Sequence, residues 1–181
     1  MNLIQASRLA TFGLVLCLVQ PAQAQIARTP VGTVDATIDG TPYPGETLDI
    51  PSEGTSTAEF RSMGPVTSIS IQAHNPEAES IMRDVLTIEV SLMGGDASSS
   101  IMDVSVSWWP DGMSEPFYLS EDSGTPPEIV FDALSLEEGA AAAQGRFSAV
   151  VCRRDSMFAD ADKNDCRQVE GAFDTDLRKA A

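Results

Sequence analysis

Two runs of alternating apolar and polar residues near the end of the chain, 145–152 and 166–177, constrain its fold most. If they pair as antiparallel strands with Cys152 opposite Cys166, the inward side chains share one face. That face comprises Phe147, Ala149 and Val151 on the first strand, and Arg167, Val169, Gly171 and Phe173 on the second. A register shift of one residue would turn every side chain to the other face. The sequence therefore predicts a β-hairpin in this register, with a Cys152–Cys166 disulfide across it.

The cysteines also indicate the compartment. Cys17 lies in a predicted leader peptide, which leaves Cys152 and Cys166 as the cysteines of the mature chain. An even pair in an exported protein normally forms a disulfide. The bond would close a loop of about 15 residues, for which the chain-entropy estimate gives about 3 kcal/mol of stability. We expect it to supplement the hydrophobic core.

The first 24 residues are predicted to be a secretory signal peptide. Arg8 precedes an apolar run that leads to Ala22-Gln-Ala24, an Ala-x-Ala cleavage motif. The run has about a dozen residues, well short of the roughly 20 that a membrane-spanning helix needs. Cys17 follows Leu16, whereas a lipidated cysteine follows a small residue, so lipidation is not expected. The mature chain should begin at Gln25 and contain no membrane span.

The charge of the chain makes some partners unfavourable. The full chain has 27 acidic and 11 basic residues and a net charge of −16 at pH 7. Phosphate-rich surfaces repel such a protein, so nucleic acid and anionic membranes are poor partners. Strong acidity with few lysines is more typical of solubility or salt adaptation than of a binding site.

The rest of the mature chain is predicted to form short strands. Alternating segments bounded by turn residues indicate strands at 33–39, 46–50, 57–63, 66–73, 85–92, 102–109, 116–119 and 129–136. Alternation breaks between Phe131 and Leu134, which predicts a β-bulge. Pro42 and Pro44 argue against a central strand over residues 41–45. Residues 75–83 are predicted to form a helical turn or two.

About eight to ten short strands without a long helical pattern predict an all-β fold. We expect an antiparallel sandwich, immunoglobulin-like or jelly-roll-like, with a barrel as the alternative. By length the mature chain is one domain with its own core. We expect a flexible N-terminus at residues 25–32, the sandwich at residues 33–177 and a C-terminal tail at residues 178–181.

The two ends of the mature chain resemble those of uncharacterised secreted bacterial β-sandwich proteins. Such chains open with an alternating strand that ends in Asn/Asp-Gly, here residues 33–40, and close with two Gly-x-Phe strands. The corresponding residues here are 145–150 and 169–177. The resemblance implies a fold and an envelope location, and it brings no catalytic residues.

Catalytic chemistry has few candidates. His74 is the only histidine, so a nucleophilic hydrolase would have to use it as the base. No Gly-x-Ser-x-Gly motif accompanies it, and we expect a surface histidine at a strand end. One histidine and a bonded cysteine pair leave zinc and copper without a ligand set, so no cofactor is expected. The many carboxylates allow a two-carboxylate glycosidase, although no pattern points to one.

A calcium site is a weaker candidate, at Asp160, Asp162, Asn164 and Asp165 within the hairpin loop. Oxygen ligands at alternate positions are typical of calcium loops. However, Asp165 stands where an EF-hand loop has glycine, and Gly171 stands where it has a bidentate glutamate. A solvated hairpin tip is the favoured interpretation.

Two aromatic residues are candidates for binding. Trp108 and Trp109 are adjacent on a strand and must point to opposite faces, so we expect one in the core and Trp109 exposed. An exposed Trp109, with Tyr118 near it, could stack on a sugar or anchor a protein. The favoured alternative is that the indole of Trp109 only covers the face or edge of a sheet and binds no ligand.

The sequence as a whole predicts a non-catalytic protein, periplasmic or secreted, of a Gram-negative-type bacterium. Its expected role is binding or structural, and its expected partner is an unknown protein or carbohydrate. A hydrolase using carboxylate or His74 chemistry and a calcium-stabilised adhesion-like module are the alternatives.

Overall fold

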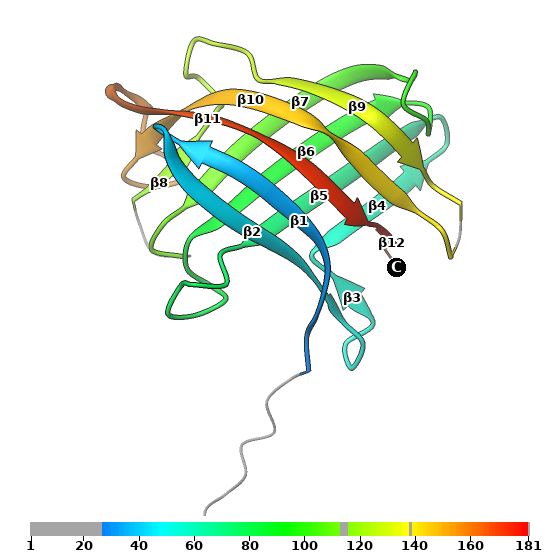
Figure 1. Cartoon of the computed structure of the whole chain (residues 1–181). Coiled ribbons are helices and arrows are strands. Elements are labelled where there is room, and N and C mark those ends of the chain that lie inside the picture. Colours follow the sequence, from blue (N-terminus) through cyan, green and yellow to red (C-terminus); the bar gives the residue numbers. More distant parts are fainter. Residues whose placement is uncertain (1–26, 113–115, 138, 181) are drawn as a thin grey trace, which may run out of the picture.

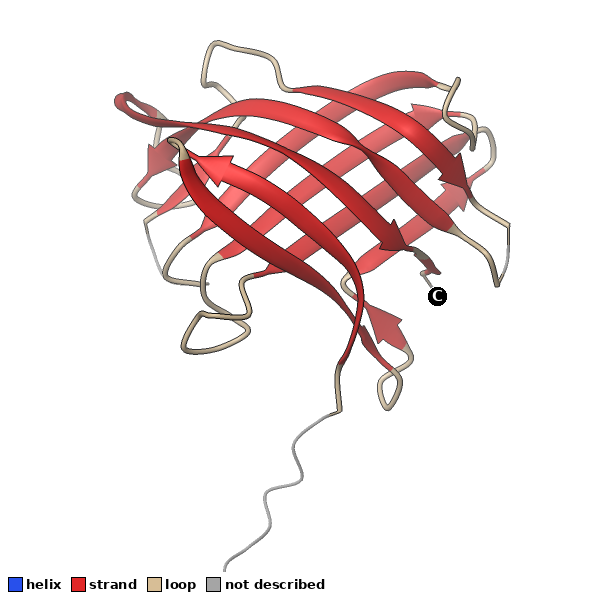
Figure 2. Cartoon of the chain, in the orientation of Figure 1, coloured by secondary structure: helices blue, strands red, loops and turns tan. Residues whose placement is uncertain are grey.

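The computed structural model describes residues 27–112, 116–137 and 139–180, and these residues form an all-β fold with no helix (Figures 1 and 2). The predicted signal peptide, Cys17 and Gln25 lie outside the described residues. Within the described ranges, no helix is long and apolar enough to cross a membrane.

The strands follow the chain in short, mostly antiparallel steps. They are β1 (Thr29–Ile38), β2 (Thr41–Ile50), β3 (Thr55–Ser56), β4 (Ala58–Met63), β5 (Val66–His74), β6 (Val85–Met93), β7 (Ser100–Trp109), β8 (Phe117–Leu119), β9 (Glu128–Ser135), β10 (Ala142–Arg154), β11 (Asp162–Asp176) and β12 (Arg178–Lys179). The pairing of β12 with β4 is parallel. The other pairs are antiparallel, as expected for strands joined by short turns.

Two groups of strands face each other across the core (Figure 1). The back sheet consists of β4, β5, β6 and β7, and the front sheet of β9, β10, β11, β1 and β2. The short strand β8 joins β7 to β10, and a single pair, Glu46 with His74, joins β2 to β5. Because β9 pairs with β10 alone, the ring of hydrogen-bonded strands is only partly closed. The all-β prediction is confirmed: the strands form one large sheet with partly ring-like bonding, which is consistent with a sandwich or a barrel-like fold.

The predicted hairpin forms in the predicted register. Cys152 lies opposite Cys166 and is bonded to it. Phe147 lies opposite Gly171, and Gly145 lies opposite Phe173. The predicted bulge in β9 also forms, because Ala133 and Phe131 pair with consecutive residues of β10 and Asp132 is left over.

Inward-facing glycines on the front sheet make room for aromatic rings. A Cβ atom at Gly171 would lie 2.6 Å from the Cβ of Ala36, and one at Gly145 would lie 2.7 Å from the ring of Phe173. Phe173 is 2% exposed and packs edge-on against Phe131. Large and small residues therefore alternate across neighbouring strands, which lets the two sheets close on a dense core.

Residues 41–45 belong to β2 but pair with β1 alone, so Pro42 and Pro44 lie in an edge segment and not in a central strand, as the sequence predicts. The structure differs from the expected bounds of the fold in two segments. Strand β1 begins at Thr29, inside the segment expected to be flexible. Residues Arg178 and Lys179, expected in a tail, pair with β4.

Residues 75–83 are also not helical. Asn75 Oδ1 accepts a hydrogen bond from the Glu77 amide, which produces an isolated turn, and a second turn joins Arg83 to Ser80. Asp84, with a φ of 52°, ends the segment. Its carboxylate accepts hydrogen bonds from the Asn75 amide group and from Trp108 Nε1, each at 2.7 Å. This loop is therefore held to the end of the back sheet by side chains rather than by helical bonds.

Candidate binding site

The outer face of the back sheet carries mainly small polar side chains. Antiparallel register places them in rows across the strands: Gln72, Thr87 and Ser107; then Ser70, Glu89 and Ser105; then Ser68, Ser91 and Asp103. The serines in these rows are half-buried. Because these side chains are short, larger residues around them rise above the surface of the sheet and can form the walls of a hollow.

A hollow of about 370 Å³ lies at the end of this face near β8, and we call it the tryptophan hollow. Its floor includes Thr87, Glu89, Ser105 and Ser107. Met82, Met157 and Trp109 also line it. The volume falls within the range typical of small-ligand sites, roughly 300 to 1,000 Å³.

Trp109 is held firmly in this hollow. Its ring stacks on Phe117 with centroids 4.4 Å apart, and its Nε1 donates a hydrogen bond to Ser107 Oγ at 2.9 Å. Phe117 is 1% exposed and does not line the hollow. Trp109 is half-buried, and it lines the hollow with surface that Phe117 leaves uncovered.

The structure separates Trp109 from the other aromatic candidate. Tyr118 is 7% exposed and belongs to the core cluster, where its ring packs 5.1 Å from Trp108. The guanidinium carbon of Arg167 lies over the Tyr118 ring, 5.2 Å from its centroid. Tyr118 of β8 pairs with Trp108 and shares its face, whereas Trp109, the next residue of β7, points to the opposite face, so Trp109 and Tyr118 do not form one exposed patch.

His74 is not the surface residue that the sequence suggested. It is 8% exposed, and its Nδ1 lies 2.7 Å from the carbonyl oxygen of Ile81 in the 75–84 loop. A carbonyl can only accept, so Nδ1 carries the proton and Nε2 is an unprotonated acceptor. Nε2 is buried and has no hydrogen-bond partner among the described residues. Burial is the main reason that the pKa of His74 is lowered.

The tryptophan hollow brings His74 together with Glu89 and Glu121. That combination is what a hydrolase would need, but the ring nitrogens are not presented to a substrate. Nδ1 is committed to Ile81, and Nε2 is shielded from solvent. A general base must lie within hydrogen-bond reach of the proton it removes, so this geometry favours binding over catalysis.

Three of the four calcium candidates, Asp162, Asn164 and Asp165, make contacts with protein groups. Asp165 forms ion pairs with Arg167 at 2.7 Å and with Arg153 at 3.7 Å. Asp162 Oδ1 accepts hydrogen bonds from the backbone amide and side chain of Asn164. In the described part of the chain, no group of three or more histidine, cysteine, aspartate or glutamate residues is placed to hold a metal ion.

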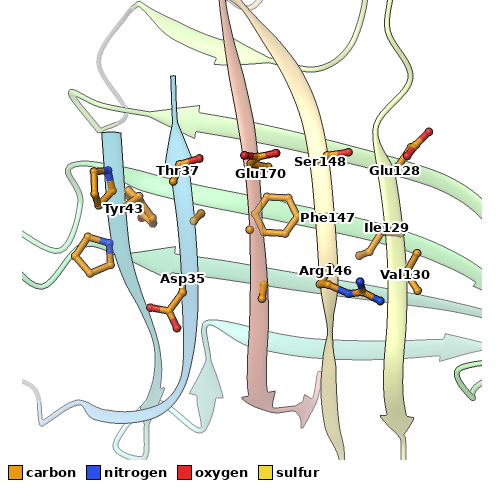
Figure 3. Close-up of a pocket in the computed structure, with 15 residues that line it drawn as sticks. Asp35, Thr37, Tyr43, Glu128, Ile129, Val130, Arg146, Phe147, Ser148 and Glu170 are labelled. Carbon is orange, nitrogen blue, oxygen red and sulfur yellow. The ribbon is translucent and has the colours of Figure 1, made fainter. Parts of the chain in front are cut away.

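A larger hollow, about 800 Å³, lies on the outer face of the front sheet (Figure 3). Asp35, Glu128 and Glu170 project around it from three strands, and Arg146 beside them binds Asp132 at 3.1 Å. Its aromatic rings, Tyr43 and Phe147, are only 3% and 4% exposed. This hollow therefore offers charge but no aromatic surface to a ligand.

The chain matches no protein family, no curated protein and no solved structure. The resemblance to secreted bacterial sandwich proteins therefore stays a prediction. The sequence singles out Trp109, which lines the tryptophan hollow, but it does not by itself indicate the polar floor beside it. The signal was present in the outward positions of the predicted strands at 66–73, 85–92 and 102–109, which are rich in serine, threonine and glutamate.

Proposed function

We propose that this protein is an exported, non-catalytic binding protein of the bacterial envelope, periplasmic or secreted, and that the tryptophan hollow is its binding site. The observation that carries the proposal is the anchored Trp109. One face of its ring rests on Phe117, and the rest lines a hollow with a hydroxyl-bearing floor. A rigid aromatic surface beside polar groups binds a ligand at low entropic cost.

Export is supported by two features of different kinds. The first 24 residues have the pattern of a cleavable signal peptide. The bond between Cys152 and Cys166 suits an oxidising compartment. A non-catalytic role is supported by the shielding of His74, the only histidine.

The test measures how much mature protein co-sediments with the insoluble envelope fraction of a Gram-negative bacterium. We expect Trp109→Ala to lower the apparent affinity about tenfold, equivalent to about 1.4 kcal/mol. Phe158→Ala is the matched control, because Phe158 is fully exposed and does not line the hollow. It should bind as the wild type does.

Thermal melts of both variants establish that they are folded before binding is compared. Equal sedimentation of Trp109→Ala and wild type would show that the tryptophan hollow is not the binding site. No sedimentation of the wild type above the level of a heat-denatured sample would count against the envelope-binding role itself.

A further inference from the structure

A second hollow continues the tryptophan hollow along the back sheet. It has a volume of about 320 Å³, and we call it the serine hollow. Ser68, Ser70 and Ser91 line it, together with Asp103. Glu89 and Ser105 line both hollows. The two hollows therefore share part of their floor and form one groove across the outer face.

The groove follows the strand direction. On β6 it extends from Val85 in the tryptophan hollow to Ser91 in the serine hollow. Six residue steps of about 3.4 Å give a length of roughly 20 Å, enough for about four linked pyranose rings. A ligand that fills the whole groove is therefore an extended chain rather than a single small molecule.

The side chains of the groove match the chemistry of a neutral sugar chain. Serine and threonine hydroxyls both donate and accept hydrogen bonds, and carboxylates such as Glu89 and Asp103 accept them from sugar hydroxyls. At the other end, Trp109 offers an aromatic surface for the apolar face of a sugar ring. The net charge of −16 disfavours anionic polymers.

An extended peptide fits the groove less well. Strands β5 and β6 are paired on both sides, so their backbone groups over the groove are committed to the sheet. A peptide strand binds by adding to a free sheet edge, where its own N–H and C=O groups find partners. Side-chain hydroxyls on a sheet face leave most of those groups unpaired.

We propose that the tryptophan and serine hollows together bind one linear chain of neutral sugar residues, with Trp109 stacked on one ring. The proposal rests on the proposed function, because it assigns a ligand class to the same binding site. It adds that the site extends beyond Trp109 and recognises several linked residues at once.

The test measures binding by isothermal titration calorimetry. The mature, oxidised protein is titrated with cello-, malto- and chito-oligosaccharides of one to six residues. We expect at least one series to bind with an affinity that rises tenfold or more between two and four residues and then levels off. A lysine-rich decapeptide is measured in parallel. Binding of the peptide alone, or affinity independent of sugar chain length, would overturn the proposal, as would the absence of binding by all three series.

One substitution separates the two hollows, and a second serves as its control. Ser91→Tyr fills the serine hollow, since Ser91 lies between Ser68 and Asp103 on the outer face. It should abolish the gain between two and four residues and leave the affinity for the two-residue sugar unchanged. Ser148→Tyr is the matched control, because Ser148 is also half-buried on an outer face but belongs to the front sheet. It should change neither the affinity for the two-residue sugar nor the gain in affinity between two and four residues.

Failure of this proposal is distinguishable from failure of the proposed function. If envelope binding depends on Trp109 while no sugar series binds, the site is real and the ligand class is wrong. If the affinity rises equally with sugar chain length in Ser91→Tyr and in the wild type, the sugar binds elsewhere and the groove is not its binding site.

Discussion

Two buried side chains, Tyr43 and His74, fix the 75–84 loop to the end of the back sheet. Tyr43 places its hydroxyl within 2.8 Å of the carbonyl oxygens of Ala73 and Asp84, and it accepts a hydrogen bond from the Leu86 amide. Burial, followed by the nearby charge of Asp84, raises its pKa. His74 lies next to Ala73 and contacts Ile81. One phenol and one imidazole therefore connect the 75–84 loop to β2 and β5.

The neutral state of His74 predicts a dependence of stability on pH. Its folded pKa is lowered from 6.5, mainly by burial, so below pH 6.5 the unfolded chain binds more protons than the folded chain. Its contribution to stability is full above pH 6.5 and is lost as the pH falls below that value. We expect the melting temperature of the wild type to fall more between pH 7.5 and 5.5 than that of His74→Gln.

The comparison isolates His74 because the chain has no other histidine. Both proteins carry the same carboxylates, so an effect of those groups is common to the two sets of melting curves. Parallel melting curves for the two proteins over this pH range would mean that His74 does not control the response.

At the scale of elements, the register of the β10–β11 hairpin could be predicted, but its extent could not, because β10 begins at Ala142 and β11 at Asp162. Its alternation, its two cysteines and its Gly-x-Phe segments all specify the same register. The alternating strands elsewhere were also predictable, as was the turn at Asp39 and Gly40, where both residues adopt positive φ. Strand β2 was not fully predictable, because proline is tolerated only where one edge is free, and sequence does not show which edges are free.

The groove could not be predicted for a related reason. Its floor combines residues from β5, β6 and β7, and their rows depend on the register between strands. A single strand reveals only that Ser68 and Ser70 share a face. The burial of His74 depends on the loop that covers it, and that loop has no periodic pattern.

The disulfide is predicted to add stability without being required for folding. Removing it with Cys152→Ala and Cys166→Ala together should cost about 3 kcal/mol, which corresponds to a fall of about 10 °C in melting temperature. Far-ultraviolet circular dichroism should retain the strand signal, because a large core remains. Reduction of the wild type should reproduce the fall.

An unchanged melting temperature would show that the bond does not constrain the unfolded chain. Loss of all strand signal at 25 °C would show that the core alone cannot support the fold.

At the scale of the whole molecule, the two ends of the folded chain meet. Thr29, which begins β1, lies opposite Asp49 on β2, and Arg178, which begins β12, forms an ion pair with the carboxylate of Asp49 at 2.9 Å. Thr29 and Arg178, near the two ends of the described fold, therefore both lie beside Asp49. The strands can therefore keep their order in space when the two ends are joined and the chain is opened in a turn.

A circular permutant should therefore fold. We expect a short glycine-serine linker between residues 180 and 28, with new termini opened between Ala97 and Ser98, to preserve the cooperative melt. Residues 97 and 98 are exposed in the turn between β6 and β7, away from the paired strands. The matched control opens the chain between Ile88 and Glu89, inside β6, and it should not fold. Equal melts for both permutants would contradict the expectation.

The pairing of β1 with β11 also bears on the timing of folding during biosynthesis. Strand β1 is among the first segments to be made, yet its neighbour on the side away from β2 is β11, whose residues 169–175 come almost last. The front sheet cannot assemble around a nascent chain that still lacks those residues. In an exported chain, as we propose this one to be, a front sheet that cannot form before residues 169–175 have been made would remain unfolded during transport across a membrane.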